Sequence, residues 1–91
     1  MKAYNIMEDI VLKYLDEMLE KRGDICTCSE CRDAIAAHAL NLIPAKYVTT
    51  EKGAMHTMME QVRVEQASTV LKVLVKSIEF VSKHTAHTKS S

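Results

Sequence analysis

Residues that break regular secondary structure are almost absent from this 91-residue chain, which contains two glycines and one proline. A β-sandwich or barrel needs turn residues about every 8–12 positions. Three such residues cannot supply those turns, so the sequence predicts an all-α fold. The length allows one hydrophobic core. We therefore expect a single small helical domain over residues 1–83 and a polar tail over residues 84–91.

The first predicted helix runs from about Tyr4 to Arg22. Apolar side chains recur there at the i, i+3, i+4, i+7 spacing of one helical face. They are Ile6, Met7, Ile10, Val11, Tyr14, Leu15, Met18 and Leu19. Acidic residues occupy the other side, so the segment is predicted to bury one face and expose the other.

A second helix is predicted from Ser29, whose hydroxyl can cap free backbone N–H groups, to about Leu42. Pro44 ends this helix, because proline cannot continue it and disfavours helical geometry in the preceding residue. The segment that follows, up to residue 50, is predicted to be an extended crossing in which Tyr47 and Val48 pack inward.

The longest predicted helix runs from about Met55 to Lys83. Its apolar residues follow the heptad spacing of a helix that packs along another helix. The seam consists of Val64, Ala67, Leu71, Leu74, Ile78 and Val81, and Val70, Val73 and Phe80 widen it. Such a helix is roughly 40 Å long at 1.5 Å per residue, which exceeds the diameter of a domain this size. We therefore expect part of its apolar face to pack against a second subunit in a homodimer.

Charge and hydropathy argue against two classes of partner. Twelve Lys and Arg balance twelve Asp and Glu, so binding to nucleic acid through bulk positive charge is not expected. The most apolar run, Val70–Val81, is interrupted by Lys72, Lys76 and Glu79, so no membrane-spanning helix is predicted. Residues 1–9 lack the apolar centre of a signal peptide. These features predict a cytoplasmic protein without membrane insertion.

The densest group of chemically reactive residues is Cys26, Cys28 and Cys31, in the pattern C-x-C-x-x-C. In a cytoplasmic protein these cysteines should stay reduced. The spacing lets the thiolates converge on one ion, and zinc prefers four tetrahedral ligands with thiolate sulfur among them. A structural zinc ion is therefore one hypothesis, and three reduced thiols without a metal are the other. The candidates for a fourth ligand are Asp33, His38, His84, His87 and water.

Enzyme motifs are missing from the sequence. A thioredoxin-like C-x-x-C belongs to a βαβ context, which is not predicted here. The patterns H-E-x-x-H, G-x-x-x-x-G-K and G-x-G-x-x-G do not occur. We therefore expect a protein that is not an enzyme, and a thiol redox enzyme remains a third hypothesis that predicts no bound metal.

The cysteine pattern and the crossing together resemble the ComFB family of late competence development proteins. The resembling residues are the three cysteines, Asp33, and the run Leu40–Thr49, with a helix on each side. The proline of the crossing stands one place earlier than is usual in the family, and a fourth cysteine of some relatives is absent. The resemblance covers nearly the whole chain.

The resemblance implies a small helical homodimer with structural zinc and a role in signalling, or in competence and motility regulation. It also implies a receptor for the second messenger cyclic di-GMP. Proteins usually bind phosphates and guanine edges with Arg or Lys, the Watson–Crick edge of guanine with carboxylates, and the face of the base with a flat group that stacks on it. The candidate ligand residues are Lys46, Tyr47, Thr49 and Arg63. Each is equally compatible with ordinary surface or core, and the alternative function is an adaptor dimer without a nucleotide and with an unidentified protein partner.

Overall fold

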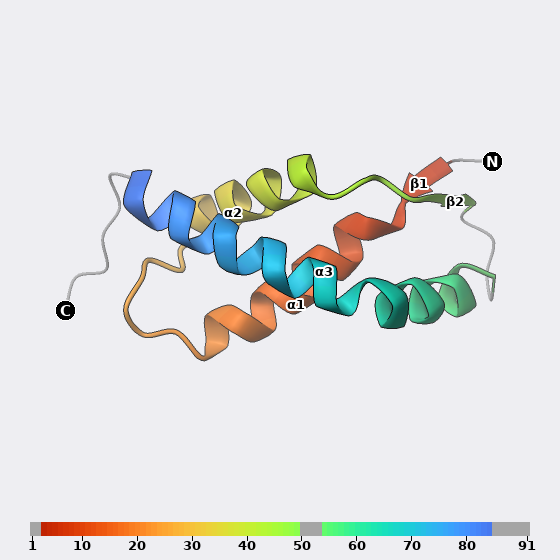
Figure 1. The fold of residues 1–91 in the computed structure, drawn as a ribbon, viewed down its shortest axis with the longest axis horizontal. Coiled ribbons are helices and arrows are strands. Elements are labelled where there is room, and N and C mark those ends of the chain that lie inside the picture. Colours follow the sequence, from red (N-terminus) through yellow and green to blue (C-terminus); the bar gives the residue numbers. More distant parts are fainter. Residues whose placement is uncertain (1–2, 50–53, 85–91) are drawn as a thin grey trace.

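The computed structural model describes residues 3–49 and 54–84, with side chains from residue 60 onward in the second range. The elements in chain order are β1 (Ala3–Asn5), α1 (Ile6–Glu20), α2 (Ser29–Leu42), β2 (Tyr47–Thr49) and α3 (Ala54–His84). The three helices form one elongated body of 44 × 23 × 20 Å. The β1–β2 pair lies at one end, and the loop between α1 and α2 lies at the other (Figure 1).

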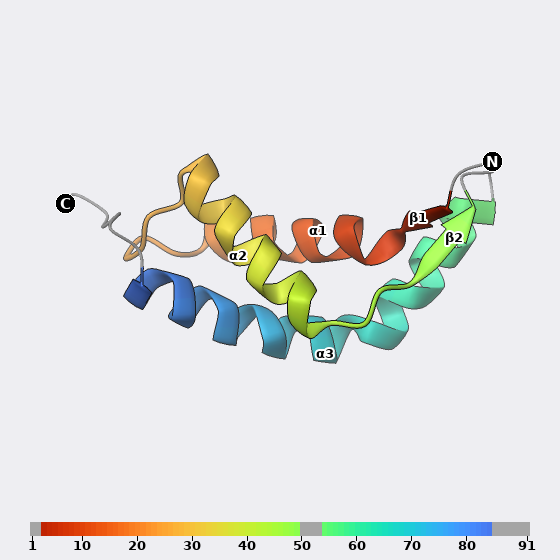
Figure 2. The same ribbon diagram turned by 90° about the horizontal axis from the view of Figure 1, so that it is seen from above.

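Helix α3 spans the full length of this body (Figure 2). Its 31 residues correspond to about 46 Å at 1.5 Å per residue. The prediction of a long C-terminal helix is therefore confirmed, and the molecule is as elongated as the helix. None of the described helices has a stretch that is both long and apolar enough to cross a bilayer. Residues 85–91 of the predicted tail lie outside the described residues, and His84 belongs to α3.

A two-stranded antiparallel ribbon adds β structure to the predicted all-α fold. Tyr4 pairs with Val48, and Asn5 pairs with Tyr47. The Asn5 side chain also accepts hydrogen bonds from the backbone N–H groups of Met7, at 3.1 Å, and Lys46, at 2.9 Å. Asn5 is the N-cap of α1, so α1 begins at residue 6 rather than at Tyr4. One side chain thus fixes both the helix start and the strand pairing.

The predicted bounds of α2 are confirmed, but its predicted cap is wrong. The N-cap residue is Cys28, whose side chain makes no capping hydrogen bond, and Ser29 is the first helical residue. At the other end Ile43 is extended, with φ −110° and ψ 126°, as the following Pro44 requires.

The crossing after α2 packs inward through one residue rather than two. Val48 is 6% exposed, whereas Tyr47 is 67% exposed. Successive residues of a strand point to opposite faces, so only one of two neighbours can reach the core. The prediction that Tyr47 packs inward is therefore wrong, and its ring is available at the surface.

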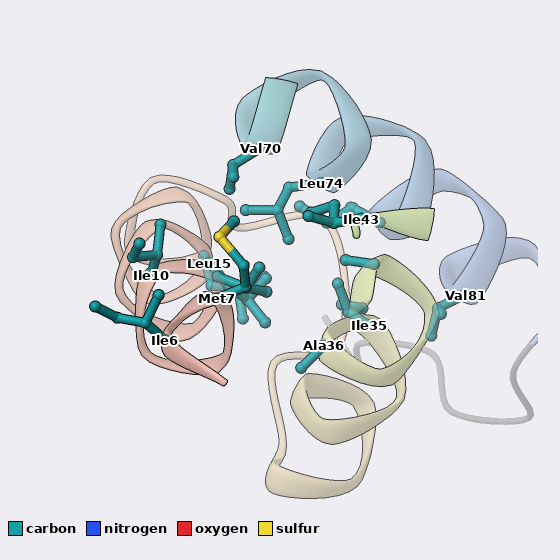
Figure 3. Close-up of a cluster of buried hydrophobic side chains, with 14 of the residues drawn as sticks. Ile6, Met7, Ile10, Leu15, Ile35, Ala36, Ile43, Val70, Leu74 and Val81 are labelled. Atoms are coloured by element: carbon teal, nitrogen blue, oxygen red, sulfur yellow. The ribbon is translucent and has the colours of Figure 1, made fainter. Parts of the chain in front are cut away.

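The core is a single cluster of aliphatic side chains from all three helices (Figure 3). Helix α1 buries the predicted face, and α2 contributes small residues that allow close approach. The most buried members are Ile6, Met7, Ile10, Val11, Leu15, Ile35, Ala39, Val70, Leu74 and Ile78. The N-terminal part of the predicted α3 seam does not join them, because Val64 is 69% exposed and Leu71 is 38% exposed. Val70 lies in the buried row instead.

Candidate metal centre

The three cysteines meet where the α1–α2 loop enters α2. Their sulfur atoms all lie within 4.8 Å of one another. Cys31 is buried, Cys26 is partly buried and Cys28 is exposed, and all three are thiols rather than disulfides. The structure therefore brings together the three cysteines that the sequence predicted as metal ligands, and among the described residues this group does not include a fourth ligand candidate.

Local geometry explains this convergence. Cys28 has extended backbone angles, φ −66° and ψ 166°, and its carbonyl accepts the Arg32 N–H at 2.9 Å. Cys31 follows one turn later, and residues three apart on a helix lie on the same side. Ile25 is 9% exposed and joins the hydrophobic core, which anchors the loop next to Cys26. The loop is thus fixed on both sides of the sulfur cluster.

The sulfur positions fit a tetrahedral metal. Zinc–sulfur bonds of about 2.3 Å place two sulfur ligands about 3.8 Å apart. Separations of at most 4.8 Å require only small side-chain rotations to reach that geometry. Thiolate donors favour zinc, copper(I) and iron–sulfur clusters over magnesium or calcium. The arrangement can hold a thiophilic metal ion with one coordination position left for another donor.

An ion pair ties the start of α2 to α1 beside the cysteines. The guanidinium of Arg32 donates to both carboxylate oxygens of Asp16, at 2.7 and 3.0 Å. This hydrogen bond lowers the pKa of Asp16 and raises the pKa of Arg32. Within the loop, Arg22 makes a similar pair with Asp24 at 2.8 and 2.9 Å. Of the two pairs, Arg32–Asp16 links α2 to α1, and Arg22–Asp24 is local to the loop.

A cavity of about 400 Å³ opens beside Cys31, between α2 and α3. Three rings stack along its wall: the centroids of His38 and Phe80 are 4.4 Å apart, and those of Phe80 and His84 are 4.2 Å apart. His38 Nδ1 also makes a 2.8 Å hydrogen bond with Ser77 Oγ. This cavity was not predicted from the sequence. Ser77, a fully buried polar residue inside an apolar stripe, was the signal that could have indicated a polar partner.

The predicted ligand residues are only partly brought together. Tyr47 and Thr49 are both exposed and lie on one face of β2, because residues two apart in a strand point the same way. Lys46 is exposed, and its carbonyl accepts the Ile6 N–H at 2.8 Å. These three residues line the ribbon at the opposite end from the cysteines.

Arg63 turns toward α1 instead. Its Nη1 donates to Tyr14 Oη at 3.3 Å, and its Nη2 donates to Glu60 Oε2 at 3.0 Å. The Glu60 and Tyr14 contacts raise the pKa of Arg63. Its Nε is buried and has no hydrogen-bond partner among the described residues. Arg63 is thus held between α3 and α1 by its bonds to Glu60 and Tyr14.

Three comparisons with known proteins agree on the same family. The family model described as late competence development protein ComFB matches residues 4–85. The competence protein ComFB of Bacillus subtilis (strain 168) is 30% identical over 78 residues, which are 86% of this chain and 80% of that protein. The solved structure of the late competence protein ComFB from Bacillus subtilis superposes with a TM-score of 0.76 at 23% identity. The match covers 93% of this chain and 96% of that one, and it shows the same fold.

Proposed function

Since this chain belongs to the ComFB family of late competence development proteins, we propose that it is a cytoplasmic, zinc-containing signalling protein with a competence-related role. The observation that supports the zinc is the convergence of three cysteine sulfurs within 4.8 Å. The metal has a structural role in this proposal, and the protein is not an enzyme. It acts through contacts with other molecules.

A structural metal suits the size and shape of this domain. A chain of this length buries roughly 60–65% of its unfolded surface, so its core supplies limited stability. The cysteines lie at the end of the loop that joins α1 to α2, where Arg22–Asp24 is an exposed pair of little energetic weight. Zinc bound to Cys26, Cys28 and Cys31 would cross-link that loop to the helix start.

The metal is tested by elemental analysis of protein purified under reducing conditions. We expect about one zinc per chain, because the three sulfurs form one site. Cys28→Ser should lose the zinc and unfold at lower temperature. Ser29→Ala is a matched control next to the site, since the Ser29 side chain is not the cap of α2. Wild-type protein without metal would contradict the proposal and favour the thiol redox hypothesis.

A homodimer is the second part of the proposal. Val64, Leu71 and Val75 are exposed along α3, at 69%, 38% and 48%. Their spacing of seven and four residues places them along one side of the helix. A two-fold interface uses the same patch on both subunits, and a stable one buries about 800 Å² per partner. The exposed apolar row from Val64 to Val75 extends over about three helical turns, which suits such an interface.

Light scattering coupled to size-exclusion chromatography tests the dimer. The wild type should have about twice the chain mass of 10.2 kDa. Val64→Glu should shift it to the monomer, because a buried charge at the interface is costly. The control Glu65→Gln changes an exposed neighbour and should leave the dimer intact. A wild type at the monomer mass would refute this part.

Cyclic di-GMP is the proposed ligand, and the ribbon is the proposed contact surface. The 67% exposed ring of Tyr47 can stack on a guanine, a contact worth about 1–3 kcal/mol per base. Lys46 and Thr49 supply a cation and a hydroxyl for phosphate. A two-fold dimer doubles this set, which matches the two-fold symmetry of the ligand. An adaptor dimer without a nucleotide is the alternative function.

Isothermal titration with cyclic di-GMP separates the two functions. A receptor should release or absorb heat on titration, and Tyr47→Ala should weaken binding by about 5- to 150-fold, which is the stacking energy of about 1–3 kcal/mol converted to affinity. Lys13→Ala changes an exposed lysine on α1 and should have no effect. Absence of binding by the wild type would leave the adaptor function.

A further inference from the structure

The last turn of α3 brings a histidine to the cavity beside the metal centre. The cavity walls come from the first turns of α2 and the end of α3. The lining residues are Glu30, Cys31, Ala34, His38, Phe80, Val81 and His84. In both ribbon views the end of α3 lies at the same end of the molecule as the α1–α2 loop and the start of α2 (Figures 1 and 2). His84 and Cys31 therefore share one cavity despite their separation in sequence.

The hydrogen bond of His84 fixes which ring nitrogen carries the proton. Nδ1 lies 2.7 Å from the backbone carbonyl oxygen of Phe80. A carbonyl oxygen only accepts, so Nδ1 is the donor, and the neutral ring has its lone pair on Nε2. Metal-bound histidines almost always donate their other ring N–H to a carbonyl or carboxylate in this way. His84 thus has the tautomer of an Nε2 ligand.

Stacking also restricts the orientation of the His84 ring. Its centroid lies 4.2 Å from that of Phe80, with 21° between the planes. Phe80 in turn stacks on His38 of α2. A ring held by a hydrogen bond and a stack has fewer orientations to lose when it binds a metal.

The other three side chains that the sequence suggested as a fourth ligand are less suitable. His38 Nδ1 bonds a serine hydroxyl, which can donate or accept, so its tautomer is not fixed. Asp33 is exposed and lies 3.7 Å from Arg32 Nη1, so binding a metal would compete with that ion pair. His87 lies outside the described residues. Among these candidates, His84 lines the same cavity as Cys31 and has the lone pair of its neutral ring on Nε2.

We infer that Nε2 of His84 completes the coordination of Cys26, Cys28 and Cys31, giving a Cys₃His site. This inference rests on the proposed metal. The group of donor atoms that lie within 4.8 Å of one another consists, among the described residues, of the three cysteine sulfurs. Binding therefore draws the last turn of α3 toward Cys31 across the cavity. Terminal turns move at low cost. The metal then cross-links α3 to α2 and to the preceding loop.

Cobalt(II) is the probe for this site, because its visible bands respond to the ligand set and its sulfur charge-transfer band scales with the number of thiolates. The full chain is stripped of metal under reducing conditions and titrated with Co²⁺. The variants are His84→Ala and His84→Cys. The control Lys83→Ala changes the exposed neighbour, and Asp33→Ala, His38→Phe and His87→Ala remove the competing donors.

Loss of a residue that only hydrogen-bonds to a metal ligand weakens metal binding by roughly 10–100-fold. His84→Ala removes a ligand itself, so it should weaken Co²⁺ binding by more than this. The visible cobalt bands should also shift, because water replaces the ring nitrogen. His84→Cys should keep the metal and raise the charge-transfer intensity by about one third, since four thiolates replace three. This gain cannot arise from unfolding. The controls and the three competing variants should match the wild type.

Failure of the proposed metal and failure of the His84 inference give different results. If the wild type gives no sulfur-to-cobalt band, the proposed metal itself is refuted. If the wild type gives the band, but His84→Ala matches it in position and affinity, the inference alone is overturned. A changed spectrum in Asp33→Ala, His38→Phe or His87→Ala would then identify the actual fourth donor.

Discussion

The hydrogen bond between His38 and Ser77 should be a measurable part of the contact between α2 and α3. Ser77 is fully buried, and its Oγ lies 2.8 Å from His38 Nδ1. Ser77→Ala removes the hydroxyl and leaves the ring nitrogen without this partner. An unsatisfied buried group costs about 1–3 kcal/mol. The neighbouring cavity of about 400 Å³ can admit water to His38, so we expect the lower half of that range, about 1–2 kcal/mol.

Helix propensity acts in the opposite direction and has to be measured separately. Alanine is better than serine in a helix by up to about 0.5 kcal/mol. Ser68→Ala, at an exposed position of α3, measures that gain without a buried bond. The difference between Ser77→Ala and Ser68→Ala is then the contribution of the buried hydroxyl. At about 4–8 °C per kcal/mol for a domain of this size, the two variants should differ by about 4–16 °C in melting temperature.

A double-mutant cycle separates this bond from other effects of the serine. His38→Phe keeps a ring to stack on Phe80 but has no ring nitrogen to bond. In that background Ser77→Ala should cost little or become stabilising, because no acceptor or donor is left unsatisfied. Chemical denaturation gives all four free energies of unfolding. Equal effects of Ser77→Ala in both backgrounds would refute the assignment of this bond to α2–α3 packing.

Three further predictions concern the core and two local hydrogen bonds. Leu74→Ala empties a fully buried position and should lower the free energy of unfolding in urea by about 2–5 kcal/mol; a loss below 1 kcal/mol, roughly, would mean that the site collapses or is not core. The Arg32 hydrogen bond lowers the pKa of Asp16 in the folded protein. The stabilisation from this pair should therefore be present above the pKa of Asp16 in the unfolded chain, and it should disappear as the pH falls through the pKa in the folded protein. Since Asp16 is half exposed, Asp16→Asn should remove at most about 1 kcal/mol at neutral pH and flatten the acid limb of the stability curve. Tyr4 donates to Asp9 at 2.6 Å, and this bond raises the pKa of Tyr4 to about 12; its stabilisation should be complete below pH 10, roughly, and be lost as the pH rises toward 12. An ultraviolet titration of the wild type against Tyr4→Phe should show one late-titrating phenol that the variant lacks.

Much of the helical structure could be predicted because its signals are local. The 3.6-residue periodicity of α1 and the proline after α2 act within a few residues, and both helices end close to the predicted positions. The β1–β2 ribbon has no such signal. Its strands have three residues each, and the pairing depends on Asn5, which bonds Lys46 at a distance of 41 residues in sequence. The predicted first helix therefore extended back to Tyr4, which in the structure belongs to β1.

The candidate metal ligands were predictable for the same reason. Six consecutive residues contain Cys26, Cys28 and Cys31, so spacing alone placed them together. The cavity wall formed by His38, Phe80 and His84 was not predictable, because it depends on which face of α3 lies against α2. A heptad seam leaves that rotation undetermined by about one residue, and the drift between 3.5 and 3.6 residues per turn adds to this. Val70 rather than Leu71 is buried, which also turns Ser77 toward His38.

The two candidate sites lie at opposite ends of the molecule, and α3 is the element that reaches both. At the cysteine end it carries Phe80 and His84 to the cavity beside Cys31, and in its other half it contacts β2. Between these contacts the row of Val70, Leu74 and Ile78 is fully buried. Close-packed interiors resist local deformation, so a bond from the metal to the last turn would fix the position of α3 along the core. A structural metal at one end would thereby help to define the α3 surface, with Val64, Leu71 and Val75 exposed, that is proposed to form the dimer interface.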